Sequence, residues 1–147
     1  MKLALVAAIW FAIPAMAQET AVKPANLPPA VRAAVEQQRQ GGTIRGLSKE
    51  TAKGKTYYEA ELAVNGHNKD VLFNAQGQVV EVEETVELGS VPPAVRATLE
   101  RESAARGAIV KVETLTKNGR LEAYEAQMKK GAKISEVSVA PDGKLIK

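Results

Sequence analysis

The chain of 147 residues contains no cysteine, and its formal net charge at pH 7 is +3. A chain of this length can bury one core of ordinary size, and its stability must come from that burial without disulfide bonds. The basic excess is small and does not indicate the clustered basic surface of a nucleic-acid-binding protein. We therefore expect no nucleic-acid partner.

The first 17 residues have the order of a secretory signal peptide. Lys2 supplies a positive start, an apolar run covers Leu3–Ile13, and Ala15-Met16-Ala17 forms an A-x-A cleavage pattern. The rival interpretation is a membrane anchor, which needs about 20 apolar residues, more than this run offers. We expect cleavage before Gln18, a periplasmic or secreted product with no membrane span, and a flexible leader over residues 18–26, which are polar and aperiodic.

Six letters of the sequence, PPAVRA, occur at Pro28–Ala33 and again at Pro92–Ala97. The correspondence continues through YEAEL and YEAQM, while the offset between the copies grows from 64 to 66 residues. A match sustained over this length is typical of an internal repeat. It predicts two tandem units, 27–86 and 87–147.

Each unit is expected to begin with a helix. The pair Pro28-Pro29 suits a helix start, because the first-turn N–H groups have no helical partner. Val31 and Val35 are four residues apart and give this helix an apolar stripe. Arg32 and Arg96 lie beside the stripes of the two helices, where we expect solvated or snorkelling side chains in preference to partner contacts.

About four antiparallel strands are expected after each helix. Over Tyr57–Val64 the hydrophobic period drops to two, and Asn65-Gly66 is a strong hairpin signal. The alternation sends Tyr58 and its apolar partners to one face of the sheet and polar side chains to the other. The second unit keeps the same division.

These segments resemble the PepSY-like family of exported bacterial domains, through YYEAEL and LFNAQGQVVEVE in the first unit and VPPAVRATLE, AYEAQM and VSVAPDGKLI in the second. Asn74 stands where the pattern has an Asp. The resemblance implies an α+β fold, in which two tandem units of a helix followed by about four antiparallel strands form one sheet with both helices on one face. Such tandem units also resemble a secreted β-lactamase inhibitor that binds with a concave, aromatic-bearing sheet face. That inhibitor carries disulfides, which this chain lacks, so its target does not transfer.

Catalysis is not expected. The single histidine, His67, falls beside a predicted hairpin turn, where no nucleophile or carboxylate would be held within hydrogen-bond reach. The sequence has no cysteine nucleophile, no G-x-S-x-G and no H-E-x-x-H motif. We therefore predict a protein that is not an enzyme, with no cofactor and no metal site.

The sheet face opposite the helices is the candidate binding surface. Its predicted side chains are Tyr57, Glu59, Glu61, Glu81, Glu83, Glu125 and Gln127. Because the second unit carries a net charge of +3 and the first is neutral over 22–86, this surface could be acidic in one unit and basic in the other, which would steer a complementary protein. The function expected is a non-catalytic exported module that binds, inhibits or regulates an envelope or secreted protein, such as a protease or another hydrolase.

Two other interpretations of the same face stay open. In many antiparallel sheets one face carries Glu and Lys side chains that contact only solvent and bind no partner protein. Alternatively, the domain is a small-ligand or cation-responsive sensor or buffer of the periplasm, with Glu59, Glu61, Glu81 and Glu83 gathering a hard cation such as Ca²⁺. Strand carboxylates are splayed across a flat surface and lack carbonyl ligands, which disfavours the cation site.

Overall fold

A computed structural model describes residues 19–147, so the expected signal peptide lies outside the described residues. The fold is α+β, with two α-helices and one nine-stranded sheet among these residues. The elements in chain order are β1 (Thr20–Ala21), the 3-10 turn η1 (Pro24–Asn26), α1 (Pro29–Arg39), β2 (Thr43–Ala52), β3 (Lys55–Val64), β4 (His67–Asn74), β5 (Val79–Thr85), the 3-10 turn η2 (Leu88–Ser90), α2 (Pro93–Arg106), β6 (Ala108–Lys117), β7 (Arg120–Lys130), β8 (Lys133–Val139) and β9 (Leu145–Ile146).

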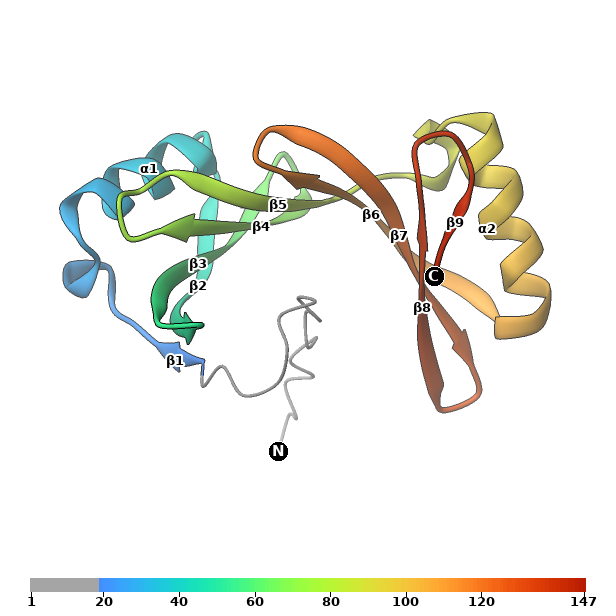
Figure 1. The fold of residues 1–147 in the computed structure, drawn as a ribbon, viewed down its shortest axis with the longest axis horizontal. Helices are drawn as coiled ribbons and strands as arrows, with labels where there is room; N and C mark the ends of the chain where they lie inside the picture. The colour runs from blue at the N-terminus through green and yellow to red at the C-terminus, as the bar shows by residue number, and fades with distance from the viewer. Residues whose placement is uncertain (1–18) are drawn as a thin grey trace.

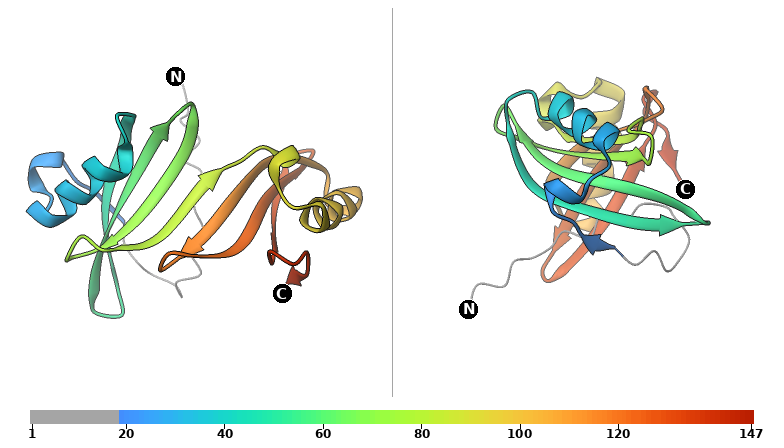
Figure 2. Two further views of the ribbon diagram at one scale, coloured as in Figure 1. Left: turned by 90° about the horizontal axis from the view of Figure 1, so that it is seen from above. Right: turned by 90° about the vertical axis from the view of Figure 1, so that its left-hand side faces the viewer.

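Every strand of the sheet pairs antiparallel with its neighbour in the chain, so the spatial order runs from β1 to β9 without a crossover. Strands β5 and β6 pair directly although α2 lies between them in the sequence. Figure 1 shows the sheet bent into an arch, and the views of Figure 2 place α1 and α2 near its two ends, on the outer side of the bend. The inner side of the arch is free of helices.

Both helices begin and end for the reasons that their sequences indicate. Pro28 and Pro92 occupy the N-cap positions, and each helix starts at the second proline of its pair. Helix α1 ends with Gln40 in the left-handed region at φ 49°, followed by a glycine. Helix α2 ends at Gly107, whose N–H donates to the carbonyl of Ser103.

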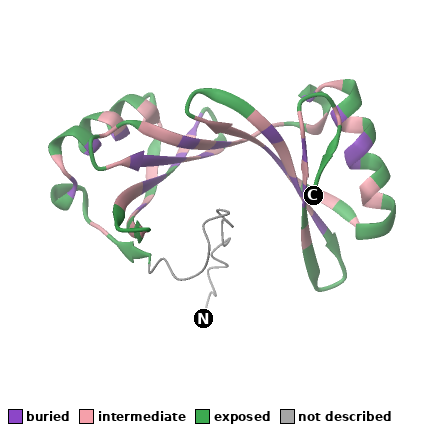
Figure 3. Ribbon diagram, in the orientation of Figure 1, coloured by how far each residue is buried: buried purple, intermediate pink, exposed green. Residues whose placement is uncertain are grey.

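The hydrophobic core consists of two clusters, one beneath each helix. Under α1, Val31 and Val35 pack against Phe73 and other strand residues. Under α2, Val95 and Leu99 pack against a cluster that includes Met128. Figure 3 shows the buried positions concentrated where helices and strands face one another. Full burial of each such side chain stabilises the fold by roughly 1.5–3 kcal/mol.

Strand register shows that the two clusters lie on the same face of the sheet. Leu62, in the cluster under α1, is paired with Lys69, and Lys69 with Glu84. Glu84 is paired with Thr114, and Thr114 with Tyr124, which packs on the cluster under α2. Directly paired residues point to the same side of a sheet. Residues that alternate with this row therefore point to the inner side of the arch.

The arginine that the two PPAVRA segments share has a structural role. The guanidinium of Arg32 donates hydrogen bonds to the carbonyls of Ala25 and Leu27, at 3.1 and 3.2 Å. Arg96 donates in the same way to the carbonyl of Gly89, at 3.3 Å. Each arginine thus ties its helix to the 3-10 turn that precedes it, which is a more specific contact than the solvated side chain that the sequence predicts.

The segment expected to be a flexible leader contains β1 and η1. Thr20 and Ala21 pair with Lys49 and Ser48 of β2. The N–H of Val22 donates to the carbonyl of Leu47 at 2.9 Å, and Val22 packs against the core under α1. The edge of β2 offers unpaired backbone groups, and this polar segment supplies partners for them.

Neither helix in residues 19–147 combines the length and the apolar character that a membrane crossing requires.

Candidate functional site: the open face of the sheet

The open face is the helix-free inner side of the arched sheet (Figures 1 and 2). All seven residues that the sequence predicts for the binding surface lie on it. Glu59 and Glu81 are both paired with Leu72, and Glu61 and Glu83 are both paired with Asp70. The remaining three alternate with core residues of their strands: Tyr57 with Tyr58, and Glu125 and Gln127 with Ala126.

Six carboxylates form a diagonal row across this face, which we call the carboxylate stripe. Each of the six strands from β3 to β8 contributes one member. Glu61 is paired with Asp70 and Asp70 with Glu83, whereas Glu113 is paired with Glu125. The members in strand order are Glu61, Asp70, Glu83, Glu113, Glu125 and Glu136. Glu59 and Glu81 flank the stripe on β3 and β5.

Asp70, Glu113 and Glu136 were not among the sequence candidates. Carboxylate oxygens of Asp70, Glu83 and Glu113 all lie within 4.8 Å of one another, although the three residues come from three strands. The alternation along β4 and β6 could have placed Asp70 and Glu113 on the polar face. The carboxylates of Asp70 and Glu113 lie close together because β5 pairs with β6, and no local pattern in the sequence predicts that pairing.

Several of these carboxylates are buried although they lie on the open face. The exposed fraction is 7% for Glu59, 6% for Glu83 and 7% for Glu113. The bend of the sheet brings side chains on its inner side together, and they cover one another. Burial disfavours the charged form of a carboxyl group, and neighbouring negative charges disfavour it further.

The pKa values of the stripe carboxylates and of Glu59 respond to this crowding. Burial, together with the charges of Glu19 and Asp70, raises the pKa of Glu59 from 4.5 to about 8. Burial and the charge of Glu113 raise the pKa of Glu83 from 4.5 to about 8. Burial raises the pKa of Asp70 from 3.8 to about 6, against the opposing effect of the Lys111 ammonium. The open face therefore holds protons at neutral pH that free carboxyl groups would have lost.

Few cationic side chains among residues 19–147 form ion pairs with the carboxylates of the open face. The ammonium of Lys111 pairs with Glu113, and that of Lys117 pairs with Glu81 at 3.2 Å. Ser138 donates a hydrogen bond to Glu125 at 2.8 Å. In contrast, the Oε1 atom of Glu59 is buried and has no hydrogen-bond partner among the described residues.

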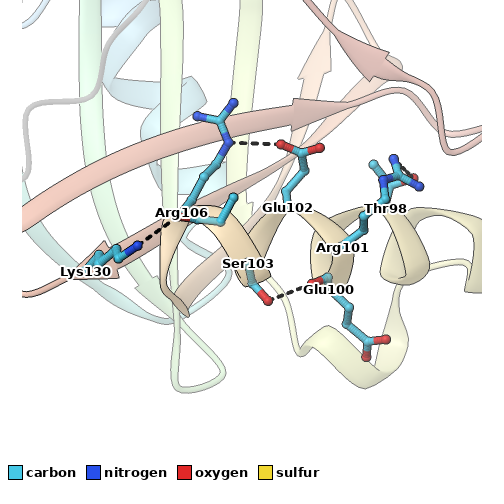
Figure 4. A network of polar contacts seen from close by, with 8 residues as sticks. Thr98, Glu100, Arg101, Glu102, Ser103, Arg106 and Lys130 are labelled. Atoms are coloured by element: carbon cyan, nitrogen blue, oxygen red, sulfur yellow. Dashed lines mark hydrogen bonds and ion pairs between the residues drawn. The ribbon is translucent and has the colours of Figure 1, made fainter.

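The lysines of residues 87–147 lie at strand ends or in turns, away from the stripe, with the exception of Lys111, which pairs with Glu113. The ammonium of Lys130 donates to the Ala105 carbonyl at the end of α2, at 3.4 Å, beside an Arg106–Glu102 ion pair (Figure 4). Lys144 pairs with Asp142 within a turn. The stripe continues from β3 to β8, so carboxylates lie on the open face on both sides of the β5–β6 pairing.

The aromatic member of the candidate surface, Tyr57, lies at one margin of the open face. It lines a hollow of about 410 Å³ together with Lys55, Asn74, Gln76 and neighbouring residues of β3 and the β4–β5 turn. A tyrosine beside a hollow offers a partner both apolar contact area and a hydroxyl group. His67 is exposed at the start of β4, where it is paired with Val64.

Comparisons with solved structures identify the same fold in proteins of Bacteroides species. A DUF2874 family protein from Bacteroides uniformis is 21% identical with a TM-score of 0.64, over 82% of this chain and 86% of that one. A BLIP-like protein from Bacteroides fragilis is 23% identical with a TM-score of 0.59, over 82% and 85%. A protein from Bacteroides eggerthii, one of its "putative periplasmic proteins", is 19% identical with a TM-score of 0.66, over 82% and 86%.

At these identities the solved structures establish the fold alone. No curated protein matches the chain. The profile of one family matches residues 56–147, which is more than half of the chain and includes strands β3 to β9. The chain therefore belongs to the beta-lactamase-inhibitor-like, PepSY-like family.

Proposed function

We propose that this protein is a non-catalytic binding module of the cell envelope, whose open face covers part of an envelope or secreted protein and regulates or inhibits it. The observation that carries the proposal is the arched, helix-free face with buried carboxylates that the described chain leaves largely without cations. A surface that only needs to be wetted has no reason to bury its carboxyl groups, because burial of a polar or charged group without a partner costs free energy.

The family supports a binding function without catalysis. Its description is inhibitor-like, and one structural neighbour is described as BLIP-like. The open face offers Tyr57 as an aromatic anchor beside a hollow, and aromatic side chains in pockets carry much of the affinity of protein interfaces. We propose a hydrolase, such as a protease, as the class of target.

We also propose that the mature chain begins at Gln18 and consists of two duplicated units, 27–86 and 87–147. The support is the PPAVRA repeat, together with a helix, a 3-10 turn and a core cluster of its own in each half. Both halves would then contribute to one continuous binding face, because their strands join at β5 and β6.

A cation-responsive domain is the competing function. The three oxygens of Asp70, Glu83 and Glu113 within 4.8 Å of one another are the observation that favours it. Against it, the ammonium of Lys111 already pairs with Glu113, and the three ligands come from strands without a carbonyl-rich loop. We therefore favour the protein-binding module.

Affinity capture with variants tests the proposal. Immobilised Gln18–Lys147 is incubated with envelope extract of the native host, and the retained proteins are identified by mass spectrometry. The open-face variant carries Glu59→Lys and Glu61→Lys, whereas the matched control carries Glu36→Lys and Glu100→Lys on the exposed sides of the helices. The proposal predicts a protein that the wild type and the control retain and that the open-face variant loses. Equal retention by the two folded variants would contradict it.

A further inference from the structure

We propose that the carboxylate stripe and the flanking Glu59 bind an extended, lysine- or arginine-bearing segment of the partner protein, with cationic side chains seated among Glu59, Asp70 and Glu83. This inference rests on the proposed function, because it specifies the chemistry of the partner at the same open face.

The shape of the stripe suits an extended chain. It crosses six neighbouring strands from β3 to β8, and strands lie about 4.8 Å apart, so it is roughly 24 Å long. An extended segment rises about 3.3 Å per residue, and roughly eight residues cover that length. Every second side chain of such a segment faces the sheet. Three or four alternating cations could therefore each lie near a carboxylate.

Glu59 provides an independent sign that a donor belongs at this position. The residue is only 7% exposed, and its buried Oε1 atom has no hydrogen-bond partner among the described residues. The side chain lies on the open face beside Asp70 and Glu61, whose charges act on it. Leaving a buried acceptor unpaired costs about 1–3 kcal/mol. A guanidinium with five N–H donors would satisfy Glu59 and reach a neighbouring carboxylate.

The cations already present on the face show that it accepts amino groups. Lys111 pairs with Glu113 and Lys117 with Glu81, and both of these carboxylates are themselves buried. No comparable ion pair to Asp70 or Glu83 occurs within residues 19–147. Asp70 and Glu83 are therefore the part of the stripe where charge complementarity to a cationic partner is greatest.

The whole protein would not attract a polycation. Its formal net charge is +3 with the first 17 residues and falls by the charge of Lys2 when they are removed. Attraction of a basic segment must then come from the local field of the stripe. An anionic surface, such as a phospholipid headgroup layer, would be repelled by the same field.

Binding of a cationic segment should release protons. A cation beside Glu59 or Glu83 favours the ionised carboxylate, so their raised pKa values fall in the complex. Affinity should therefore rise between about pH 6 and 8. The charged groups that act on Glu59 are Glu19, Glu50, Glu61 and Asp70, and those that act on Glu83 are Asp70, Glu81, Glu113 and Glu125. Lys111 and Arg45 oppose these charges at Asp70.

Calorimetry with a defined peptide tests the inference. The probe is an acetylated peptide of four Ala-Arg repeats, and the control probe has four Ala-Gln repeats. Titrations of Gln18–Lys147 in two buffers with different ionisation enthalpies measure both the dissociation constant and the protons released. The test variant is Glu59→Gln with Glu83→Gln, and the matched control is Glu36→Gln with Glu100→Gln. Glutamine keeps the size of the side chain and removes the repulsion, so the test variant should fold.

The inference predicts that the arginine peptide binds with proton release, that the test variant weakens binding by about tenfold or more, and that the control variant does not. Failure of the peptide to bind, or equal weakening by both variants, would overturn it. If CaCl2 binds the wild type at submillimolar concentration and the arginine peptide does not bind, the stripe is a divalent-cation site and the inference is also overturned. A partner captured only through the open face, without binding of the arginine peptide, would refute this inference and leave the proposed function intact.

Discussion

Asp70 and Glu83 lie directly opposite each other on neighbouring strands β4 and β5, on the inner side of the arched sheet. Like charges in this position destabilise a sheet. The chain tolerates the pair because burial and the surrounding carboxylates raise both pKa values, to about 6 for Asp70 and about 8 for Glu83. A cation supplied by a partner would relieve the same repulsion, which connects the crowding of carboxylates on this face with the binding function proposed for it.

Stability should fall as pH rises. Glu59 and Glu83 have folded-state pKa values of about 8 against 4.5 as ordinary groups, so the folded state holds more protons between these values. Their stabilising contribution is complete below the unfolded pKa and is lost as pH rises through the folded pKa. The free energy of unfolding, measured by urea denaturation, should decrease from about pH 5 to 8, by at most ~1.4 kcal/mol per pH unit for each group.

The variant Glu59→Gln with Glu83→Gln provides the control for this pH dependence. Glutamine does not titrate, so the slope should flatten in the variant. A wild-type protein whose stability is constant or increases over this pH range would show that Glu59 and Glu83 ionise normally.

Phe73 should be the most costly truncation under α1. Its side chain is 0% exposed and belongs to the cluster that includes Val31 and Val35. Phe73→Ala should lower the free energy of unfolding by about 3–5 kcal/mol, through lost burial and the cavity left behind. Ile134→Ala, at a position that is 52% exposed on β8, should change it by less than about 0.5 kcal/mol. Similar losses in the two variants would contradict the assigned core.

Gly77 and Gly66 allow backbone strain to be separated from close packing. Both have a positive φ, 78° and 80°. A Cβ atom at Gly66 meets nothing within 4 Å, whereas one at Gly77 would lie 2.6 Å from the carbonyl oxygen of Ala30. Gly66→Ala should cost about 1 kcal/mol from strain alone. Gly77→Ala should cost about 2–4 kcal/mol, because the β4–β5 turn must also move away from α1. Equal costs in thermal or urea unfolding would exclude this close approach.

Thr98 connects α2 with the turn that precedes β9. Its hydroxyl donates to the carbonyl of Gly143 at 2.7 Å, and the two residues are 45 positions apart. Thr98→Val keeps the shape and removes the donor, so it should destabilise the protein by about 1 kcal/mol. Thr51→Val at an exposed position of β2 is the matched control and should be close to neutral. A neutral Thr98→Val would mean that the turn before β9 is held by other contacts.

The sequence predicts the helix starts and the two faces of the sheet well, because each depends on local chemistry. The proline pairs place the beginnings of α1 and α2, and the alternation around Tyr58 assigns Glu59 and Glu61 to the open face. At the β4–β5 turn, Asn74 replaces the expected Asp without loss, since its Oδ1 accepts from the N–H groups of Gln76 and Gln78 at 3.0 Å.

The stripe could not be predicted, because it depends on contacts between distant segments. Asp70 and Glu113 come together only because β5 pairs with β6, two strands that α2 separates in the sequence. The strand register also shifts by one residue at Leu72/Phe73 and at Leu115/Thr116. Nor does the polar composition of residues 18–26 reveal that Thr20 and Ala21 add a strand to β2. Burial of the carboxylates follows from the bend of the sheet, which is a property of the assembled fold.

The most direct test of the open face as the binding surface is the affinity of the captured partner for two charge-reversal variants. Its dissociation constant is measured with Glu59→Lys/Glu61→Lys, on the open face, and with Glu36→Lys/Glu100→Lys, on the helices. We expect the first pair to weaken binding by about tenfold or more and the second to leave it unchanged. Full affinity in the open-face variant, or a loss confined to the helix variant, would place the partner on the opposite side of the sheet and contradict the account.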